Sequence, residues 1–301
     1  MTVLVLGGSG FIGRHLLRRL AAAGDVVIAT SRNPAGQPEM TNLHWCKLDL
    51  ADFDDWRSLL TDVSQVYHLA WSTIPATAES DPVGDMTVNV GGSVRLLEAL
   101  KDRPGIRLVF VSSGGMVYGR PVRVPVLETD PAEPIGIHGI SKLEVEHYIA
   151  HHAAHFDLDA VVLRVANAYG QGQYSGRPFG AVSTFCHLAK AREPLKIFGD
   201  GTVVRDYVHV DDIVDALLSV AVTHSGQRVF NIGSGIGHSL NDVVAIIERM
   251  CGYKLSKKHL ARRIFDVPIS ILDPTKALLE LGWRARISIE DGVARMLASE
   301  S

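Results

Sequence analysis

The sequence predicts an α/β protein built on a doubly wound parallel sheet, with helices on both faces and a second, smaller α/β unit. Two observations carry this prediction. Short runs of β-branched residues alternate with amphipathic stretches through the first half of the chain, and these runs are apolar throughout, as in strands buried on both faces. A chain of 301 residues is also long for one core, so a smaller companion domain is expected.

The elements follow one another in a regular order. The expected strands of the first half are the apolar runs at residues 3–6, 26–30, 66–70, 107–113 and 158–166. The expected helices have apolar residues at helical spacing and occupy residues 13–24, 88–101, 141–154 and 181–191. A glycine ends the first of these helices. After residue 167 glycine and proline punctuate the chain, which predicts a loop-rich region over the sheet edge.

Composition excludes several classes of protein. A formal net charge of −3 gives no reason to expect nucleic acid or an anionic membrane as a partner. No apolar run reaches the length of a membrane span. Three widely spaced cysteines are typical of reduced thiols rather than of a disulfide framework, so a cytoplasmic protein is expected.

Glycines cluster where the first expected strand meets the first expected helix, in VLVLGGSGFIGRHLL (residues 3–17). Their spacing fits G-x-G-x-x-G, and also a variant with a glycine every third residue. Such a turn lets the backbone approach a diphosphate, and the helix N-terminus adds free N–H groups and a positive dipole end. A packing turn without a ligand is the alternative. The junction favours a dinucleotide, with contacts expected at Gly7, Gly10, Phe11, Ile12 and Gly13.

The end of the second expected strand affects the choice of cofactor. An acid there would hold the adenosine ribose of NAD, but the chain reads ATSRNP and has Ser31 and Arg32 instead. Arginine can pair with a 2′-phosphate through charge-assisted bonds. The sequence therefore favours NADP over NAD. A solvated surface charge is the alternative for Arg32.

With these motifs in place, the chain resembles the extended short-chain dehydrogenase/reductases, the nucleotide-sugar epimerase/dehydratase family that includes the UDP-glucose 4-epimerases. The resemblance covers nearly the whole chain. It is carried, in the family's order, by GGSGFIG (7–13), LDL (48–50), YHLAW (67–71), VNVGGSVRLLEA (88–99), VFVSSGGMVYG (109–119), LRVANAYGQG (163–172) and FGDGTVVRDYVHVDDIVDAL (198–217).

The resemblance implies a modified Rossmann domain, residues 1–166 and 203–229. A smaller α/β substrate-binding domain, residues 167–202 and 230–301, would close over a nucleoside-diphosphate sugar. Further cofactor contacts are implied at Asp49, Leu50, Leu69, Ala70, Trp71, Asn89 and Lys142. Substrate contacts are implied at Asn167, Arg205 and Arg263 for the diphosphate and at Asp266 for the ribose.

Two acidic residues near Arg205 leave an alternative open. Arg205 could form a structural ion pair with Asp206 or Asp212 instead of binding a diphosphate. We expect Asp212 to cap the helix that follows it.

The active-site motif departs from the family's pattern at two positions. The family carries Y-x-x-x-K on the active-site helix, where the lysine holds the nicotinamide ribose and the tyrosine moves a proton. This chain keeps Lys142 but has His138 at the tyrosine position. The hydroxyl residue that orients the sugar falls at Gly114, so Ser113, one residue away, is expected to replace it.

A histidine is chemically able to replace the tyrosine. Imidazole titrates near neutral pH, and a nearby ammonium favours its neutral form, which can accept a proton from an alcohol. We therefore expect His138, Lys142 and Ser113 to be the catalytic residues. Proton transfer by Tyr118 or Ser113 and complete loss of redox activity stay open as alternatives.

The residues that follow Gly114 restrict the reaction. The family's 4,6-dehydratases place an acidic pair where this chain has Gly115 and Met116, and neither residue can carry a proton. Epimerisation through a transient 4-keto sugar remains, with NADPH-dependent reduction of a keto sugar as the alternative. The double loss at Gly114 and His138 leaves a third hypothesis, a catalytically decayed cofactor- and nucleotide-sugar-binding protein.

Histidines follow the active-site motif along the same expected helix. His147, His151 and His155 are spaced at i, i+4 and i+8, with His152 beside them. This spacing allows a metal site, but a solvated or subunit-facing stripe is favoured and no metal is expected. The resemblance implies a homodimer in which this helix and the helix at 88–101 form a four-helix bundle.

Overall fold

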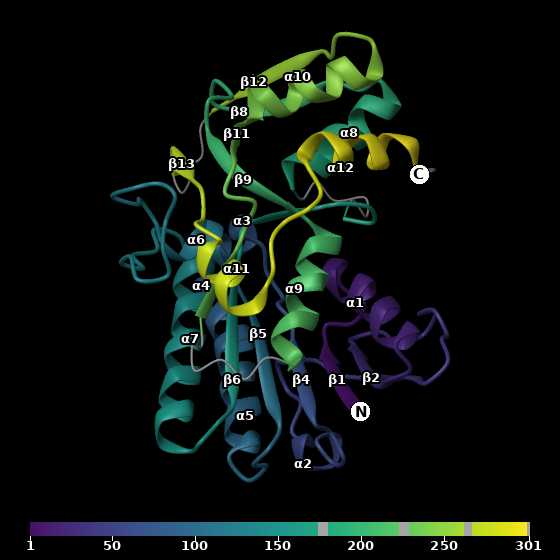
Figure 1. Cartoon of the computed structure of the whole chain (residues 1–301), viewed down its shortest axis with the longest axis vertical. Helices are drawn as coiled ribbons and strands as arrows, with labels where there is room; N and C mark the ends of the chain where they lie inside the picture. The colour runs from purple at the N-terminus through teal and green to yellow at the C-terminus, as the bar shows by residue number, and fades with distance from the viewer. Residues whose placement is uncertain (174–179, 223–228, 262–266, 300–301) are drawn as a thin grey trace.

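The computed structural model describes residues 1–173, 180–222, 229–261 and 267–299 (Figure 1). Arg263 and Asp266 therefore lie outside the described residues. No helix within the described ranges is long and apolar enough to cross a membrane.

A seven-stranded sheet forms the larger unit, in the order β10-β6-β5-β4-β1-β2-β3 with every ladder parallel. Its strands are β1 (Thr2–Leu6), β2 (Val26–Ser31), β3 (Leu43–Lys47), β4 (Gln65–His68), β5 (Arg107–Ser113), β6 (Ala160–Val165) and β10 (Val229–Ile232). The order reverses between β1 and β4, so a crevice opens there at the carboxyl ends of the strands. The expected doubly wound parallel sheet is confirmed.

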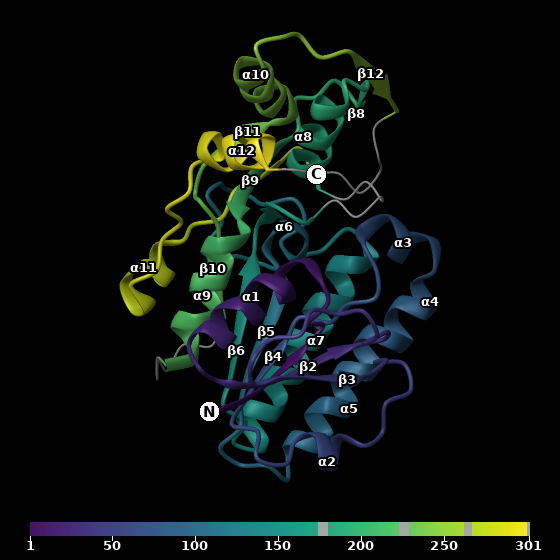
Figure 2. The same ribbon diagram turned by 90° about the vertical axis from the view of Figure 1, so that its right-hand side faces the viewer.

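Helices cover both faces of this sheet (Figures 1 and 2). One face of β1 packs with α1 (Phe11–Ala22) and α9 (Val210–Val222), and the other packs with α5 (Gly91–Leu100) and α7 (Ile137–His155). Shorter helical segments are α2 (Trp56–Leu59), α3 (Pro75–Ser80), α4 (Pro82–Asp85), a π-helix (Met86–Val90) and α6 (Gly114–Val117). Because α7 begins four residues before its expected start, it contains both His138 and Lys142.

The smaller unit has its own core, in which Phe185, Ile247 and Val293 pack together. A four-stranded sheet contains β7 (Asn167–Tyr169), β9 (Val204–His209), β11 (Gly237–Ser239) and β13 (Ile269–Ser270), and β8 (Leu195–Phe198) pairs with β12 (Lys257–Leu260). The helices are α8 (Ala181–Ala191), α10 (Leu240–Cys251), α11 (Thr275–Leu281) and α12 (Ile289–Ala298).

Strand pairing corrects the expected division of the chain at two places. Residues 230–232 belong to β10 of the large sheet, although they were expected in the smaller domain. β9 pairs with β7, β11 and β13 in the small sheet, although it was expected in the larger domain. Both strands come from segments that cross between the two units, where sequence runs alone do not reveal the pairing partner.

Candidate active site

The glycine turn between β1 and α1 leaves no room for side chains. A Cβ at Gly13 would lie 2.3 Å from the Gly7 oxygen, and one at Gly7, where φ is +84°, would lie 2.8 Å from the Ala70 nitrogen. The N–H of Gly10 donates to the Gly7 oxygen at 3.0 Å. α1 begins at Phe11 with no side-chain cap and no acid in its first turn. Its N–H groups and positive dipole end are therefore open to an anion, which fits the diphosphate of a dinucleotide.

The loop after β4 forms the next part of the wall, and Asn89 organises it. The Asn89 side chain accepts hydrogen bonds from the N–H and the hydroxyl of Ser72 at 2.8 and 3.0 Å. Its amide donates to Asp85 at 2.9 Å and to Thr73 at 3.2 Å. Asn89 has no exposed surface. It therefore acts on this site by holding the loop.

The adenosine end of the crevice contains the residues that bear on cofactor choice. The hydroxyl of Thr30 accepts the N–H of Gly7 at 3.1 Å and supports the glycine turn. Ser31 uses its hydroxyl within its own turn, donating to the Asn33 oxygen at 3.0 Å. Arg32, the next residue, has an exposed side chain. Among Ser31 and Arg32, the arginine is thus the side chain free to meet a ligand.

The acid–aliphatic pair after β3 is held from two sides. Asp49 accepts the N–H of Ala51 at 3.1 Å, and Leu50 is buried. Gly92 of α5 packs so closely that a Cβ there would lie 2.7 Å from the Leu50 oxygen. The turn is therefore fixed at the edge of the crevice.

Lys142 lies in the interior of the site with 5% of its surface exposed. Its ammonium donates to the Val111 oxygen at 2.8 Å and lies 3.6 Å from the ring centroid of Trp71. Burial lowers the pKa of Lys142 to about 7, against the opposing effect of the Glu146 and Asp85 carboxylates. Lys142 therefore titrates near neutral pH.

His138 lies one helical turn before Lys142, and its ring meets Trp71 edge-on with 5.8 Å between centroids. Burial, and then the charge of Lys142, lower the pKa of His138 to about 4, while Asp85 acts in the opposite direction. Its Nδ1 is buried and has no hydrogen-bond partner in the described part of the chain. A neutral imidazole with an unused nitrogen is able to accept a proton.

The end of β5 determines which hydroxyl reaches the site. Ser112 donates its hydroxyl to the buried Glu146. A Cβ on Gly114 would lie 2.4 Å from a methyl carbon of Leu272 and 2.9 Å from the Arg164 oxygen, so no side chain fits there. Ser113 is half-buried at the strand end and supplies the remaining hydroxyl.

Tyr118 does not belong to the proton-transfer group, which corrects one of the alternatives. It is 3% exposed, and its hydroxyl donates to Asn231 at 2.7 Å and accepts from Arg164 at 2.9 Å. Burial raises the pKa of Tyr118 to about 12. Arg164 in turn pairs with Glu146 at 2.7 Å. Tyr118 is therefore part of a buried structural network.

The smaller unit brings two expected substrate contacts to the crevice. Asn167 lies next to Gly115 and donates to the Asp206 backbone oxygen at 3.1 Å. Arg205 donates to the backbone oxygens of Val204 and Val267, both at 2.8 Å.

The two acidic neighbours of Arg205 are engaged by backbone N–H groups. Asp206 accepts from Ser234 at 2.8 Å and from Gly235 at 3.2 Å. Asp212 accepts the N–H of Ile287 at 3.0 Å. Asp212 therefore ties the C-terminal segment to α9, and the expectation that it caps the helix is wrong.

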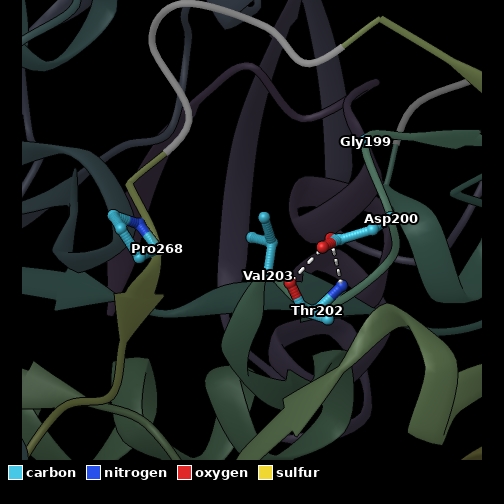
Figure 3. A pocket seen from close by; sticks show the side chains of 5 residues that line it. All are labelled: Gly199, Asp200, Thr202, Val203 and Pro268. Atoms are coloured by element: carbon cyan, nitrogen blue, oxygen red, sulfur yellow. Dashed lines mark hydrogen bonds between the residues drawn. The ribbon is translucent and has the colours of Figure 1, made fainter.

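A cavity of about 290 Å³ lies in the smaller unit (Figure 3). It is lined by Gly199, Asp200, Thr202, Val203 and Pro268. Within it, the N–H and hydroxyl of Thr202 both donate to Asp200, at 3.0 and 2.6 Å. The cavity thus has one polar end.

Comparison with known proteins identifies the family. The profile of the NAD dependent epimerase/dehydratase family matches residues 3–233. The chain belongs to this family. A UDP-glucose 4-epimerase of Mycolicibacterium smegmatis is 34% identical over 306 residues, covering 98% of this chain and 97% of that protein. A dTDP-4-dehydro-6-deoxyglucose reductase of Escherichia coli is 29% identical and covers 99% and 96%.

Solved structures lead to the same family. The UDP-glucose 4-epimerase of Thermotoga maritima, solved with UDP-glucose, has a TM-score of 0.93 and 34% identity, and the match covers 99% of this chain and 97% of that one. The UDP-glucose 4-epimerase of Thermus thermophilus, solved with NAD, has a TM-score of 0.90 and 30% identity over 99% and 98%. The expected family, fold and nucleotide-sugar epimerase class are confirmed.

The histidines in the second half of α7 fall into two groups, those on the surface and one that faces inward. His147 and His151 lie on the surface with Glu144 and Tyr148, and the rings of His151 and His155 are 4.5 Å apart. His152 instead faces inward and bonds to Glu98 of α5 at 3.1 Å, so it does not belong to the surface stripe. In the described ranges no three metal-ligating side chains come together.

Sequence reasoning missed Asp85, which accepts a hydrogen bond from Ser141 on the helix that carries His138 and Lys142. Asp85 has no exposed surface and influences the charge of both residues. The sequence signal that could have found it is an acidic residue four positions before Asn89, the residue that holds the loop after β4.

Proposed function

We propose that the protein is a UDP-sugar 4-epimerase in which His138 performs the proton transfer of the family's tyrosine. One observation carries the proposal. A buried, neutral imidazole lies one helical turn from a buried lysine, at the carboxyl end of a sheet whose glycine turn fits a dinucleotide.

The proposed chemistry has two halves that balance. In the first, the sugar's 4-hydroxyl gives its proton to His138 as the hydrogen on C4 leaves with its electron pair. A nicotinamide cofactor, which the glycine turn and Lys142 would hold, would supply an acceptor for that hydride and a donor of it to the opposite face of C4. In the second half, His138 gives the proton back to the oxygen, which completes inversion without net oxidation.

The other residues bind and orient. Lys142 holds the nicotinamide ribose, the glycine turn holds the cofactor diphosphate, and Ser113 orients the sugar hydroxyl. Asn167 and Arg205 are proposed to hold the substrate diphosphate, together with Arg263 for the diphosphate and Asp266 for the ribose. The cavity lined by Gly199, Asp200, Thr202, Val203 and Pro268 is proposed to take the nucleoside end.

Product analysis tests the function. Purified protein is incubated with UDP-, GDP- and dTDP-sugars, and products are separated while absorbance at the nicotinamide band is followed. The proposal expects conversion of a UDP-sugar to its 4-epimer with no net consumption of cofactor. No product from any sugar in the panel would contradict the proposal and favour the decayed binding protein.

A second candidate, reduction of a nucleotide keto-sugar, is supported by the strand end at Arg32. An arginine there without an acid suits the 2′-phosphate of NADPH, and the E. coli relative is a reductase by name. Stoichiometric oxidation of NADPH with a dTDP-4-keto-6-deoxy sugar, without epimerisation of UDP-sugars, would favour this candidate.

We also propose a homodimer formed through the helical face of α4, the π-helix and α7. These helices carry four exposed large apolar side chains, Val83, Met86, Ile140 and Tyr148. Light scattering tests the assembly, and Ile140→Glu is expected to shift it to a monomer. A monomeric native protein at micromolar concentration would contradict the dimer. The cytoplasmic location stays a prediction.

A further inference from the structure

We propose that Asp85 is a positioning residue of this active site, a buried carboxylate that balances the positive charge of Lys142 and His138 and joins their helix to the loop beneath the cofactor. The inference rests on the proposed function, since it assigns a role to Asp85 within that same site.

Asp85 joins three separate parts of the chain. It has no exposed surface and lies at the end of α4, where the π-helix Met86–Val90 begins. Thr73 from the loop after β4 and Asn89 from the π-helix both donate to Oδ1, the latter at 2.9 Å. Ser141 of α7 donates to Oδ2. The carboxylate therefore fixes α7 relative to the cofactor loop.

The position of Ser141 along α7 shows which residues its hydrogen bond to Asp85 holds in place. Ser141 is adjacent to Lys142 and three residues after His138, so its hydrogen bond to Asp85 holds the turn that carries both groups. The π-helix at the other side of the joint is a rare element that occurs mostly at functional sites. The turn of α7 that contains Ser141 and the π-helix, which both bond to Asp85, thus belong to the active-site wall.

The hydrogen bonds that Asp85 accepts do not by themselves require a negative charge at this position. All three hydrogen-bond donors to Asp85 are neutral, and an asparagine of the same size avoids burying a charge. Asp85 forms no salt bridge within the described residues. Its charge is explained by Lys142, whose ammonium is buried nearby without a carboxylate in direct contact.

The other charged groups around the pair are already engaged. Glu146 of α7 pairs with Arg164 at 2.7 Å. Glu79 of α3 accepts the N–H of Ile137 at 2.8 Å, at the start of α7. Glu146 and, to a smaller extent, Asp85 both favour the charged form of Lys142, and of these two carboxylates only Asp85 also favours the charge that His138 acquires during proton transfer.

Replacing Asp85 by asparagine keeps the size and removes the charge. Because Asp85 raises the pKa of Lys142, Asp85→Asn is expected to lower the midpoint of Lys142. The value of kcat is expected to fall about tenfold or more, since the protonated imidazole loses its counter-charge. KM is expected to stay unchanged, because Asp85 is buried and touches no substrate.

The test is a pH titration of ¹³C-labelled lysine by NMR, with the Lys142 signal assigned by its absence in Lys142→Met. Asp81→Asn is the matched control: it removes an exposed carboxylate from the start of the same helix, where it accepts the Gly84 N–H at 3.0 Å. The proposal expects a lowered midpoint in Asp85→Asn and an unchanged one in Asp81→Asn. An unchanged midpoint in Asp85→Asn would overturn it.

The wild-type protein supplies a second measurement that does not depend on the folding of a variant. The carboxyl carbon of Asp85, followed by NMR, is expected to show an inflection at the midpoint of Lys142; absence of that inflection overturns the proposal. Neither titration requires turnover. A shifted midpoint in a protein without epimerase activity would therefore refute the proposed function and leave the role of Asp85 standing.

Discussion

The ammonium of Lys142 lies 3.6 Å from the ring centroid of Trp71, so the indole covers the charged end of the active-site lysine. Desolvated cation–π pairs of this kind are worth about 2 kcal/mol. The same indole meets the ring of His138 edge-on at 5.8 Å. Trp71 thus contacts both groups, and burial of the site as a whole lowers the pKa values of Lys142 and His138.

The pH dependence of turnover follows from these two values. His138 accepts a proton only when neutral, so activity is lost as pH falls through about 4. Lys142 binds the ribose best as a cation, so activity declines as pH rises through about 7. We expect a bell-shaped plot of kcat/KM with its maximum between these values. A plot that stays level from pH 5 to pH 9 would contradict this assignment.

Removing the buried ammonium is expected to stabilise the protein while abolishing activity. The pKa of Lys142 is lower in the folded than in the unfolded protein, so the unfolded state binds more protons between about pH 7 and 10.5. At pH 7 the free energy of unfolding of Lys142→Met is expected to be about 2 kcal/mol higher than that of the native protein, and this difference should become smaller toward pH 10. Urea denaturation at both pH values measures this.

Lys101 provides the control for that experiment. It is only partly buried, at the end of α5, and its ammonium pairs with Glu98 at 2.6 Å and lies 4.2 Å from the ring centroid of Phe156. Lys101→Met is expected to change the unfolding free energy by about 0.5 kcal/mol or less at either pH. Equal changes in both variants would show that burial of Lys142 carries no penalty.

The glycine turn predicts a sharp difference between two glycine-to-alanine changes. Gly13→Ala places a Cβ 2.3 Å from the Gly7 oxygen and is expected to abolish binding of NAD, measured by calorimetry. In Gly91→Ala the nearest atoms lie 3.8 Å or more away in a helical segment, so binding should persist and stability should rise by about 0.5–1 kcal/mol. Retention of NAD by Gly13→Ala would disprove the diphosphate site.

The local parts of this structure could be predicted from the sequence, and the parts made by distant contacts could not. The order of strands and helices follows from apolar runs, but β3 was missed because LHWCK lies at the sheet edge with His44 and Lys47 exposed. The glycine turn and the His138–Lys142 spacing are patterns within one element. Asp85 joins the site through Ser141, 56 residues away, and no local pattern reveals that contact.

We expect cofactor preference to depend on Arg32. Its side chain is exposed at the end of β2, where it can meet a 2′-phosphate. We expect Arg32→Asp to weaken NADP binding at least tenfold and to strengthen NAD binding, measured by calorimetry with each cofactor. Arg18→Asp, on an exposed position of α1, is the control and should leave the ratio of the two affinities unchanged. An unchanged ratio in Arg32→Asp would exclude Arg32 from cofactor choice.

The proton-transfer role of His138 is tested most directly by assaying His138→Ala with the UDP-sugar that the native protein converts to its 4-epimer, with binding of that UDP-sugar measured in the same preparation. Since only the proton acceptor is removed, we predict that binding persists while kcat falls at least about 100-fold, the usual contribution of a general base. Wild-type turnover in His138→Ala would contradict the account.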